Sequence, residues 1–101
     1  MTMNVQIQAV HFDADIKLLD HVNRKLEKLQ NFNDRIVQVN VFLKLDNVVH
    51  SIKDKIAEIR VHIPRHNFFV KSTSKSFEES FDDALGTMIG QLKKNKEKKA
   101  A

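Results

Sequence analysis

Cysteine, tryptophan and tyrosine are absent from this chain of 101 residues, which also contains one proline and two glycines. Without cysteine there can be no disulfide and no thiolate zinc site, so a reducing cytoplasm is the simplest compartment. No apolar run approaches the roughly 20 residues of a membrane-spanning helix. The N-terminus also lacks the basic and then apolar pattern of a secretion signal. These absences predict a cytoplasmic protein that does not use a membrane as its partner.

Motifs that carry chemistry are missing as well. The chain has no G-x-S-x-G, no glycine-rich phosphate loop and no carboxylate pair spaced around a base. His62 and His66 have a ligand-like spacing, but Pro64 breaks any helix between them, and no thiol or nearby carboxylate completes a metal set. We therefore expect neither an enzyme nor a protein that binds a metal, a cofactor or a small-molecule substrate.

The positive charge is concentrated at the end of the chain. With 42% apolar and 30% charged residues, the composition is that of one ordinary globular domain. Residues 1–92 carry 12 Lys or Arg and 12 Asp or Glu, so the net charge of +4 lies in residues 93–101. This distribution predicts a domain of residues 1–95 followed by a disordered basic tail, 96–101. Such a tail either binds a polyanion or only solubilises the end of the chain.

Four stretches alternate apolar and polar side chains with the period of two that is typical of half-buried β-strands. They are residues 3–9, 35–45, 53–63 and 68–73, with a loop predicted at 46–52. A tight turn is predicted between the last two strands, since Pro64 fixes its own φ and Asn67 tolerates a positive φ.

Two other stretches have the spacing of amphipathic helices. Residues 15–32 begin with Asp15 as the predicted N-cap. Their apolar side comprises Leu19, Val22, Leu26 and Leu29. Residues 76–94 begin with Ser76 and Glu79, which fit a reciprocal capping box. The apolar stripe of this second helix comprises Phe77, Phe81, Ala84, Leu85, Met88 and Leu92.

The order β-α-β-β-β-α predicts a four-stranded mixed sheet. The helix between the first two strands makes them parallel neighbours, whereas short connections make the remaining strands antiparallel. Since each helix has one apolar face, both helices should cover the same side, giving an α+β two-layer sandwich. The other side is then open to solvent, with Gln6, Gln8, Gln38, Asn40, Phe42, Arg60, His62, Phe69 and Lys71.

The first helix carries a basic stripe opposite its apolar face. The stripe consists of Lys17, His21, Arg24 and Lys28, with Lys25 beside them. Long cationic side chains on a rigid helix suit phosphates, because one turn rises about 5.4 Å, close to the phosphate spacing along a nucleic-acid strand. The alternative is a solvated face, which Asp20 and Glu27 partly neutralise. If the two helices pack in parallel, the end of the first also lies near residues 93–96.

Two further features allow more than one interpretation. Gly86 and Gly90 are predicted on the outward face of the second helix. They either allow the backbone of a partner to approach closely or lie on an ordinary surface where the low helix propensity of glycine is tolerated. Phe42 and Phe69 on the open sheet face could stack on bases. The strand order and the missing glycine–aromatic signature instead favour cross-strand packing or a partner contact.

Residues 21–29, HVNRKLEKL, resemble the H-V-x-x-R/K-L/K-x-K-L segment in the first helix of the ribosome hibernation promoting factors. This family is also known as ribosome-associated translation inhibitors and as σ54 modulation proteins. The opening strand MNVQIQAVHF, the order of elements and the ending QLKKNK of the second helix agree with the family over essentially the whole chain.

The resemblance implies a non-catalytic, ribosome-associated protein that occupies the messenger and transfer RNA channel of the small subunit and inhibits translation under stress. Its partners would be the 30S subunit, through 16S ribosomal RNA, and in addition 70S or 100S ribosomes. The matched RNA-binding cations are Arg24, Lys25, Lys28, Lys93, Lys94 and Lys96, to which the stripe adds Lys17 and His21.

The second helix departs from the family pattern. Many members carry Lys or Arg where this chain has Gly86, Thr87 and Gly90, and its first turns are acidic. We therefore expect RNA contacts there to be weaker or shifted toward the C-terminus. The length resembles that of the short, dimer-promoting type. The alternative function is a generic RNA-binding or protein-interaction module that uses the open sheet face.

Overall fold

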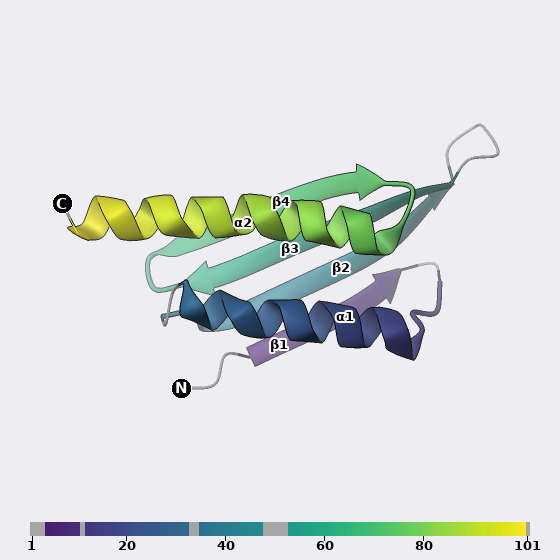
Figure 1. Ribbon diagram of the computed structural model, residues 1–101, viewed down its shortest axis with the longest axis horizontal. Coiled ribbons are helices and arrows are strands. Elements are labelled where there is room, and N and C mark those ends of the chain that lie inside the picture. The colour runs from purple at the N-terminus through teal and green to yellow at the C-terminus, as the bar shows by residue number, and fades with distance from the viewer. Residues whose placement is uncertain (1–3, 11, 33–34, 48–52, 101) are drawn as a thin grey trace.

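The structure is a computed structural model that describes residues 4–10, 12–32, 35–47 and 53–100, without the side chains of 46–47, 53–54 and 96–100. Its elements follow the predicted order β-α-β-β-β-α (Figure 1). The strands are β1 (Asn4–Val10), β2 (Gln38–Asn47), β3 (Lys53–Ile63) and β4 (His66–Ser74). The helices are α1 (Ile16–Glu27), the short 3₁₀ turn η1 (Lys28–Asn31) and α2 (Phe77–Ala100). Residues 48–52 of the predicted loop lie outside the described ranges.

The four strands form one sheet in the order β1-β2-β3-β4. β1 and β2 pair in parallel, with Ile7 opposite Val41. The other two pairs are antiparallel, with Val41 opposite Ile59 and Ile59 opposite Val70. This row of apolar residues crosses the sheet on one side, as the period of two requires. The predicted parallel crossover and the antiparallel strands that follow it are confirmed.

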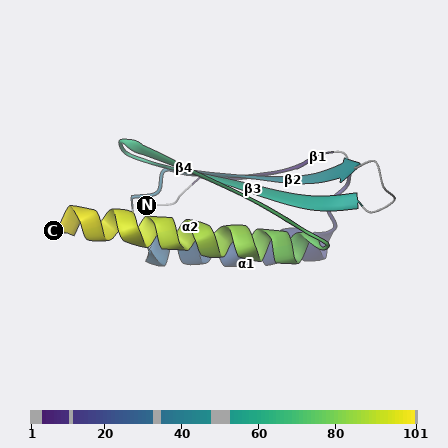
Figure 2. The same ribbon diagram turned by 90° about the horizontal axis from the view of Figure 1, so that it is seen from above.

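Both helices lie on the same side of the sheet, and no other described element covers the opposite side (Figure 2). The helices run in the same direction along the sheet (Figure 1). The core lies between the two layers, and its largest fully buried side chains include Phe81, Leu26, Leu29, Leu43, Ile59, Ile63, Met88 and Leu92. The predicted α+β two-layer sandwich is confirmed.

Helix α1 begins where the sequence predicts. The Asp15 carboxylate accepts a hydrogen bond of 2.8 Å from the Leu18 amide, which satisfies a free donor of the first turn. The predicted apolar face is wrong at one position, because Leu18 is 6% exposed whereas Leu19 is only half-buried. Both leucines lie within about one turn of Val22, so the sequence pattern alone does not distinguish them. Packing against the sheet selects Leu18.

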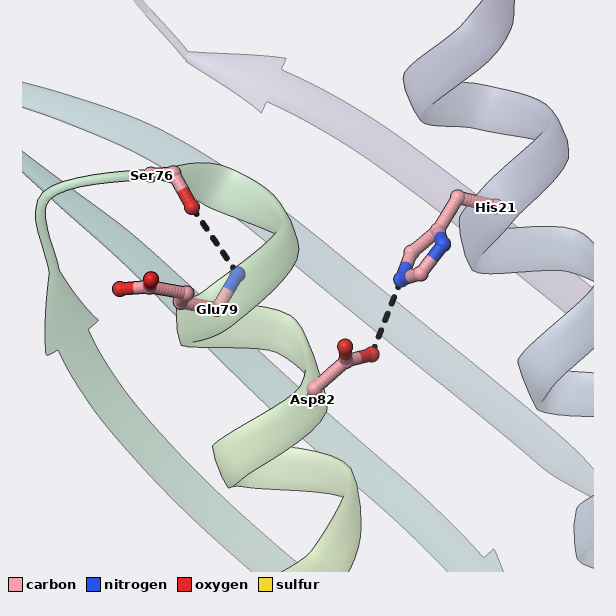
Figure 3. Close-up of polar contacts among 4 residues, drawn as sticks. All are labelled: His21, Ser76, Glu79 and Asp82. Carbon is pink, nitrogen blue, oxygen red and sulfur yellow. Dashed lines mark hydrogen bonds and ion pairs between the residues drawn. The ribbon is translucent and has the colours of Figure 1, made fainter.

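Helix α2 begins with half of the predicted capping box. The Ser76 hydroxyl accepts a hydrogen bond of 3.2 Å from the Glu79 amide (Figure 3). The Glu79 carboxylate does not accept the reciprocal hydrogen bond from the Ser76 amide. It instead accepts a 2.6 Å hydrogen bond from the Ser74 hydroxyl at the end of β4. The helix continues to Ala100, so its predicted end at Lys94 is wrong. The division into a domain of residues 1–95 and a tail of residues 96–101 stays a prediction.

The hairpin between β3 and β4 has a loop of two residues, Pro64 and Arg65. Arg65 adopts a φ of 75°, as the third position of a type II turn requires after a proline. The prediction of a positive φ at Asn67 is therefore wrong. Asn67 already pairs with His62 in the strand ladder, which holds it in an extended conformation.

Candidate nucleic-acid interface

The basic stripe of α1 faces solvent, opposite the side that packs on the sheet. Its members and Asp20 line one surface groove of about 510 Å³: Lys17, His21, Arg24, Lys25 and Lys28. Lys17, Arg24 and Lys28 are exposed, whereas His21 and Lys25 are half-buried. The structure thus brings all five predicted residues together, four on α1 and Lys28 at the start of η1, on a helical segment whose other side lies in the core.

The groove has an excess of positive charge, because Asp20 is the one acid among its lining residues. Arg24 on α1 and Lys28 at the start of η1 are four residues apart, and like charges at that spacing on a helix cost roughly 0.2–0.5 kcal/mol. The negative end of the helix dipole offsets part of this cost in the last turn, where Arg24 and Lys25 lie. A bound anion would relieve the remaining repulsion.

His21 connects the two helices. Its Nε2 lies 2.9 Å from Oδ1 of Asp82 on α2 (Figure 3). Its ring also packs edge-to-face with the Phe81 ring, with the centroids 6.2 Å apart. One ring nitrogen is therefore already occupied, and half-burial limits access to the rest of the ring. Of the five residues in the stripe, His21 has a clear structural role in holding α2 beside α1.

The parallel arrangement brings Lys93, about two turns before the end of α2, beside the end of the first helical segment. The Lys93 Nζ lies 5.1 Å from the centroid of the Phe32 ring, which directly follows η1. Such a cation–π contact orients the ammonium without neutralising it. Lys94 is exposed, and the side chain of Lys96 lies outside the described residues. The predicted proximity of the two basic clusters is confirmed for Lys93.

The helical layer has opposite charges at its two ends. Exposed carboxylates lie in the first turns of α2, at Glu78, Glu79, Asp82 and Asp83. Since the helices run in the same direction, these acids lie at the start of the layer, while Lys28 and Lys93 lie near its other end (Figure 1). An anionic partner is therefore favoured at the C-terminal ends of both helices.

The open face of the sheet holds a cluster of three side chains that the sequence pattern does not predict. The Arg60 guanidinium carbon lies 5.5 Å from the Phe42 ring centroid and 5.3 Å from that of Phe69. Alternation already predicted all three residues on this face. Strand register was the missing signal, since pairing β3 with β4 through the hairpin sets Arg60 directly opposite Phe69.

The described residues offer no arrangement suited to metal chemistry. Among them, no group of three or more His, Cys, Asp or Glu could hold a metal ion. His62 and His66 point to different partners, since His62 Nδ1 is hydrogen-bonded to Asn67 Oδ1 and the His66 ring packs near Phe68. Neither described helix is both long enough and apolar enough to cross a membrane.

Two solved structures share this arrangement of strands and helices. A ribosomal subunit interface protein from Coxiella burnetii superposes with a TM-score of 0.81 at 20% identity, covering 93% of this chain and 98% of that one. The N-terminal domain of Thermus thermophilus Protein Y superposes with a TM-score of 0.78 at 23% identity, covering 91% of this chain and 98% of that one. At these identities, the similarity establishes a common fold.

Sequence comparison extends this likeness to named relatives. The chain is 31% identical over 100 residues to a ribosome hibernation promotion factor of Bacillus subtilis. The aligned region covers 95% of this chain but 50% of that protein. The chain therefore spans about half the length of that relative. It is 26% identical over 96 residues to a ribosome hibernation promoting factor of Klebsiella oxytoca, covering 95% of this chain and 96% of that one. A family model described as Sigma 54 modulation protein / S30EA ribosomal protein matches residues 5–100, and the chain belongs to this family.

Proposed function

We propose that this protein is a non-catalytic ribosome-binding factor that occupies the messenger and transfer RNA channel of the small subunit and so inhibits translation under stress. The named relatives, which are ribosome hibernation factors, support the choice of partner. The observation that carries the proposal is the basic groove of α1, which all five members of the stripe line, four from α1 and Lys28 from the start of η1.

The groove suits a phosphate backbone better than a small anion. Arg24 and Lys28 are one helical turn apart, so their charged groups can meet successive phosphates about 5–6 Å apart. Arg24 can also bind one phosphate through two parallel N–H donors, whereas Lys25 and Lys28 act as point charges. A row of this kind binds ribosomal RNA without reading base sequence.

The second helix extends the same surface. Lys93 and Lys94 lie in the C-terminal half of α2, and Lys93 is held over the Phe32 ring, which directly follows η1. Lys96 follows three residues after Lys93 in the sequence. Cations from two parallel helices form a broad positive surface, which fits a channel lined with 16S ribosomal RNA.

Inhibition by this route requires occupancy and no chemical step. A rigid two-layer domain held against 16S ribosomal RNA would exclude messenger and transfer RNA from the same space. The protein would therefore be cytoplasmic and ribosome-associated, with the 30S subunit as its main partner and 70S or 100S ribosomes as further partners.

Co-sedimentation with purified 30S subunits over a range of salt concentrations tests the proposal. If four to six Lys or Arg side chains contact phosphates, the logarithm of the affinity should fall by roughly 3–5 for each tenfold rise in salt. Competition with a transfer RNA bound to the same subunits tests the channel. Binding that is insensitive to salt, or that leaves transfer RNA in place, would contradict the proposal.

A further inference from the structure

The sheet face opposite the helices has the features of a second binding surface. No described element covers this face (Figure 2). It contains a hollow of about 440 Å³ at the end of the sheet near the β3–β4 hairpin. The polar and aromatic residues that line the hollow include Gln38, Asn40, Arg60, His62, Asn67 and Phe69. This volume is within the roughly 300–1,000 Å³ of ordinary ligand sites.

One wall of the hollow is a stacking platform. Phe69 is 50% exposed, although it is a large apolar side chain in the middle of a strand. The Arg60 guanidinium packs against its ring at 5.3 Å and against the Phe42 ring at 5.5 Å. The guanidinium is therefore in cation–π contact with both rings, and these contacts restrict where it lies on the sheet face. Exposed aromatic rings and guanidinium planes are the groups on which unpaired bases stack.

The rest of the hollow supplies hydrogen-bond donors and acceptors. The Gln38 side-chain amide donates to Asn40 Oδ1 at 3.0 Å, and no other described residue is hydrogen-bonded to the Gln38 carbonyl oxygen or the Asn40 amide group. His62 Nδ1 is hydrogen-bonded to Asn67 Oδ1, and within the described part of the chain the Asn67 amide group and His62 Nε2 have no further hydrogen-bond partner. Donors and acceptors in fixed positions match the edge of a nucleobase.

The charge of this face also favours an anionic ligand. Glu58 is buried and pairs with Lys44 at 2.7 Å, so its charge is compensated. Among the described residues, neither Arg60 nor Lys71 forms an ion pair, and both are exposed. Lys71 follows Phe69 by two residues on β4 and therefore lies on the same face, within reach of a phosphate next to a stacked base.

We propose that this hollow binds an unpaired base of single-stranded RNA. The base would stack on Phe69 and Arg60, and the polar side chains of the hollow, such as Asn40, would form hydrogen bonds with the edge of the base. A protein partner fits less well, because interface centres are rich in apolar side chains and Phe69 is the one exposed large apolar residue described on this face. The site lies on the opposite side of the sheet from the groove of α1, so one protein could hold two RNA segments at once.

The test measures the binding of a fluorescent single-stranded RNA of about six nucleotides, a length within the site sizes of known single-strand binders. It uses the full chain carrying Arg24→Ala, Lys25→Ala and Lys28→Ala, so that the groove of α1 does not contribute. Adding Phe69→Ala should weaken binding roughly 5- to 150-fold, whereas Phe69→Tyr should preserve it. Val37→Ala is the matched control, since Val37 is 51% exposed and does not line the hollow.

Three results would overturn the proposal: equal binding by the Phe69→Ala and parent proteins, equal binding of duplex RNA, or saturable binding of peptides but not RNA. Amide chemical shifts of the wild-type protein, titrated with the same RNA, give a readout that does not depend on any variant. They should change most around Asn40, Arg60 and Phe69. Co-sedimentation of the Phe69→Ala variant with 30S subunits separates this site from the groove of α1. If the groove is the ribosome contact, this variant should still bind 30S subunits even where it has lost the single-stranded RNA.

Discussion

His21 Nε2 lies 2.9 Å from Asp82 Oδ1 and joins the polar sides of two parallel helices whose apolar sides share one core. The contact lies in the first half of both helices, while Lys93 over the Phe32 ring forms a second contact near their C-terminal ends. The basic surface is therefore supported at two points along its length. The two side chains are 29% and 44% exposed, which limits the energy of the contact.

The first prediction concerns this contact. In a double-mutant cycle of His21→Ala and Asp82→Ala, the coupling free energy of unfolding should be only about 0.2–1 kcal/mol, because solvent screens a partly exposed pair. Urea unfolding measures it. Asp83→Ala is the matched control, since Asp83 is an exposed neighbour without an ion pair among the described residues. A coupling of several kcal/mol would mean that this contact, rather than the core, holds the helices together.

The second prediction concerns the stripe. Replacing Arg24, Lys25 and Lys28 with Ala should release the protein from 30S subunits and lower the salt slope of any residual binding by roughly 2–3, through the loss of three phosphate contacts. The melting temperature should change little, since none of these three side chains belongs to the hydrophobic core of the described residues and Ala favours a helix.

Lys75→Ala is the control for charge in this experiment. Lys75 is an exposed cation outside the groove, so its loss should leave binding to 30S subunits nearly unchanged. Circular dichroism completes the design. A triple variant that has melted would identify the stripe as structural, and a folded triple variant that binds normally would rule out the groove as the ribosome contact.

The strand pattern predicted the fold well, because the side of each residue and the pairing of consecutive strands depend on the local sequence. Alternation placed each strand residue on a side, and short connections left antiparallel pairing as the simple solution. β3 has the predicted bounds, Lys53–Ile63. Where a boundary depended on a stop signal, prediction failed. No glycine or proline follows Lys94, and lysine and alanine favour helices, so α2 continues to Ala100.

Contacts between distant segments were not predictable from the sequence. Ser74 captures the Glu79 carboxylate only because β4 ends beside the start of α2. Similarly, Arg60 meets both Phe42 and Phe69 only once the register of three strands is known. Local patterns placed the stripe on one side of a helix, whereas the partnership of His21 with Asp82 required the packing of two helices.

The third prediction tests the corrected core face of α1. Leu26 is 1% exposed and Leu18 is 6% exposed, so replacing either with Ala should destabilise the protein by roughly 2–5 kcal/mol. Leu19→Ala should cost less, because this side chain is only half-buried. Urea unfolding of the three variants under identical conditions measures the order. A larger cost at Leu19 than at Leu18 would restore the original assignment of the helix face.

The last prediction separates the two interpretations of Gly86 and Gly90. Neither glycine has a positive φ, and a Cβ built on either would meet no atom within 4 Å. Replacing each with Ala should therefore stabilise α2 by roughly 0.5–1 kcal/mol through helix propensity, seen as a higher melting temperature. If these positions form an ordinary surface, both variants should bind 30S subunits like the parent protein. If the backbone of α2 approaches its partner closely there, binding should fall although stability rises. Thr87→Ala is the control, because it changes an exposed residue on the same helix without adding a Cβ at a glycine.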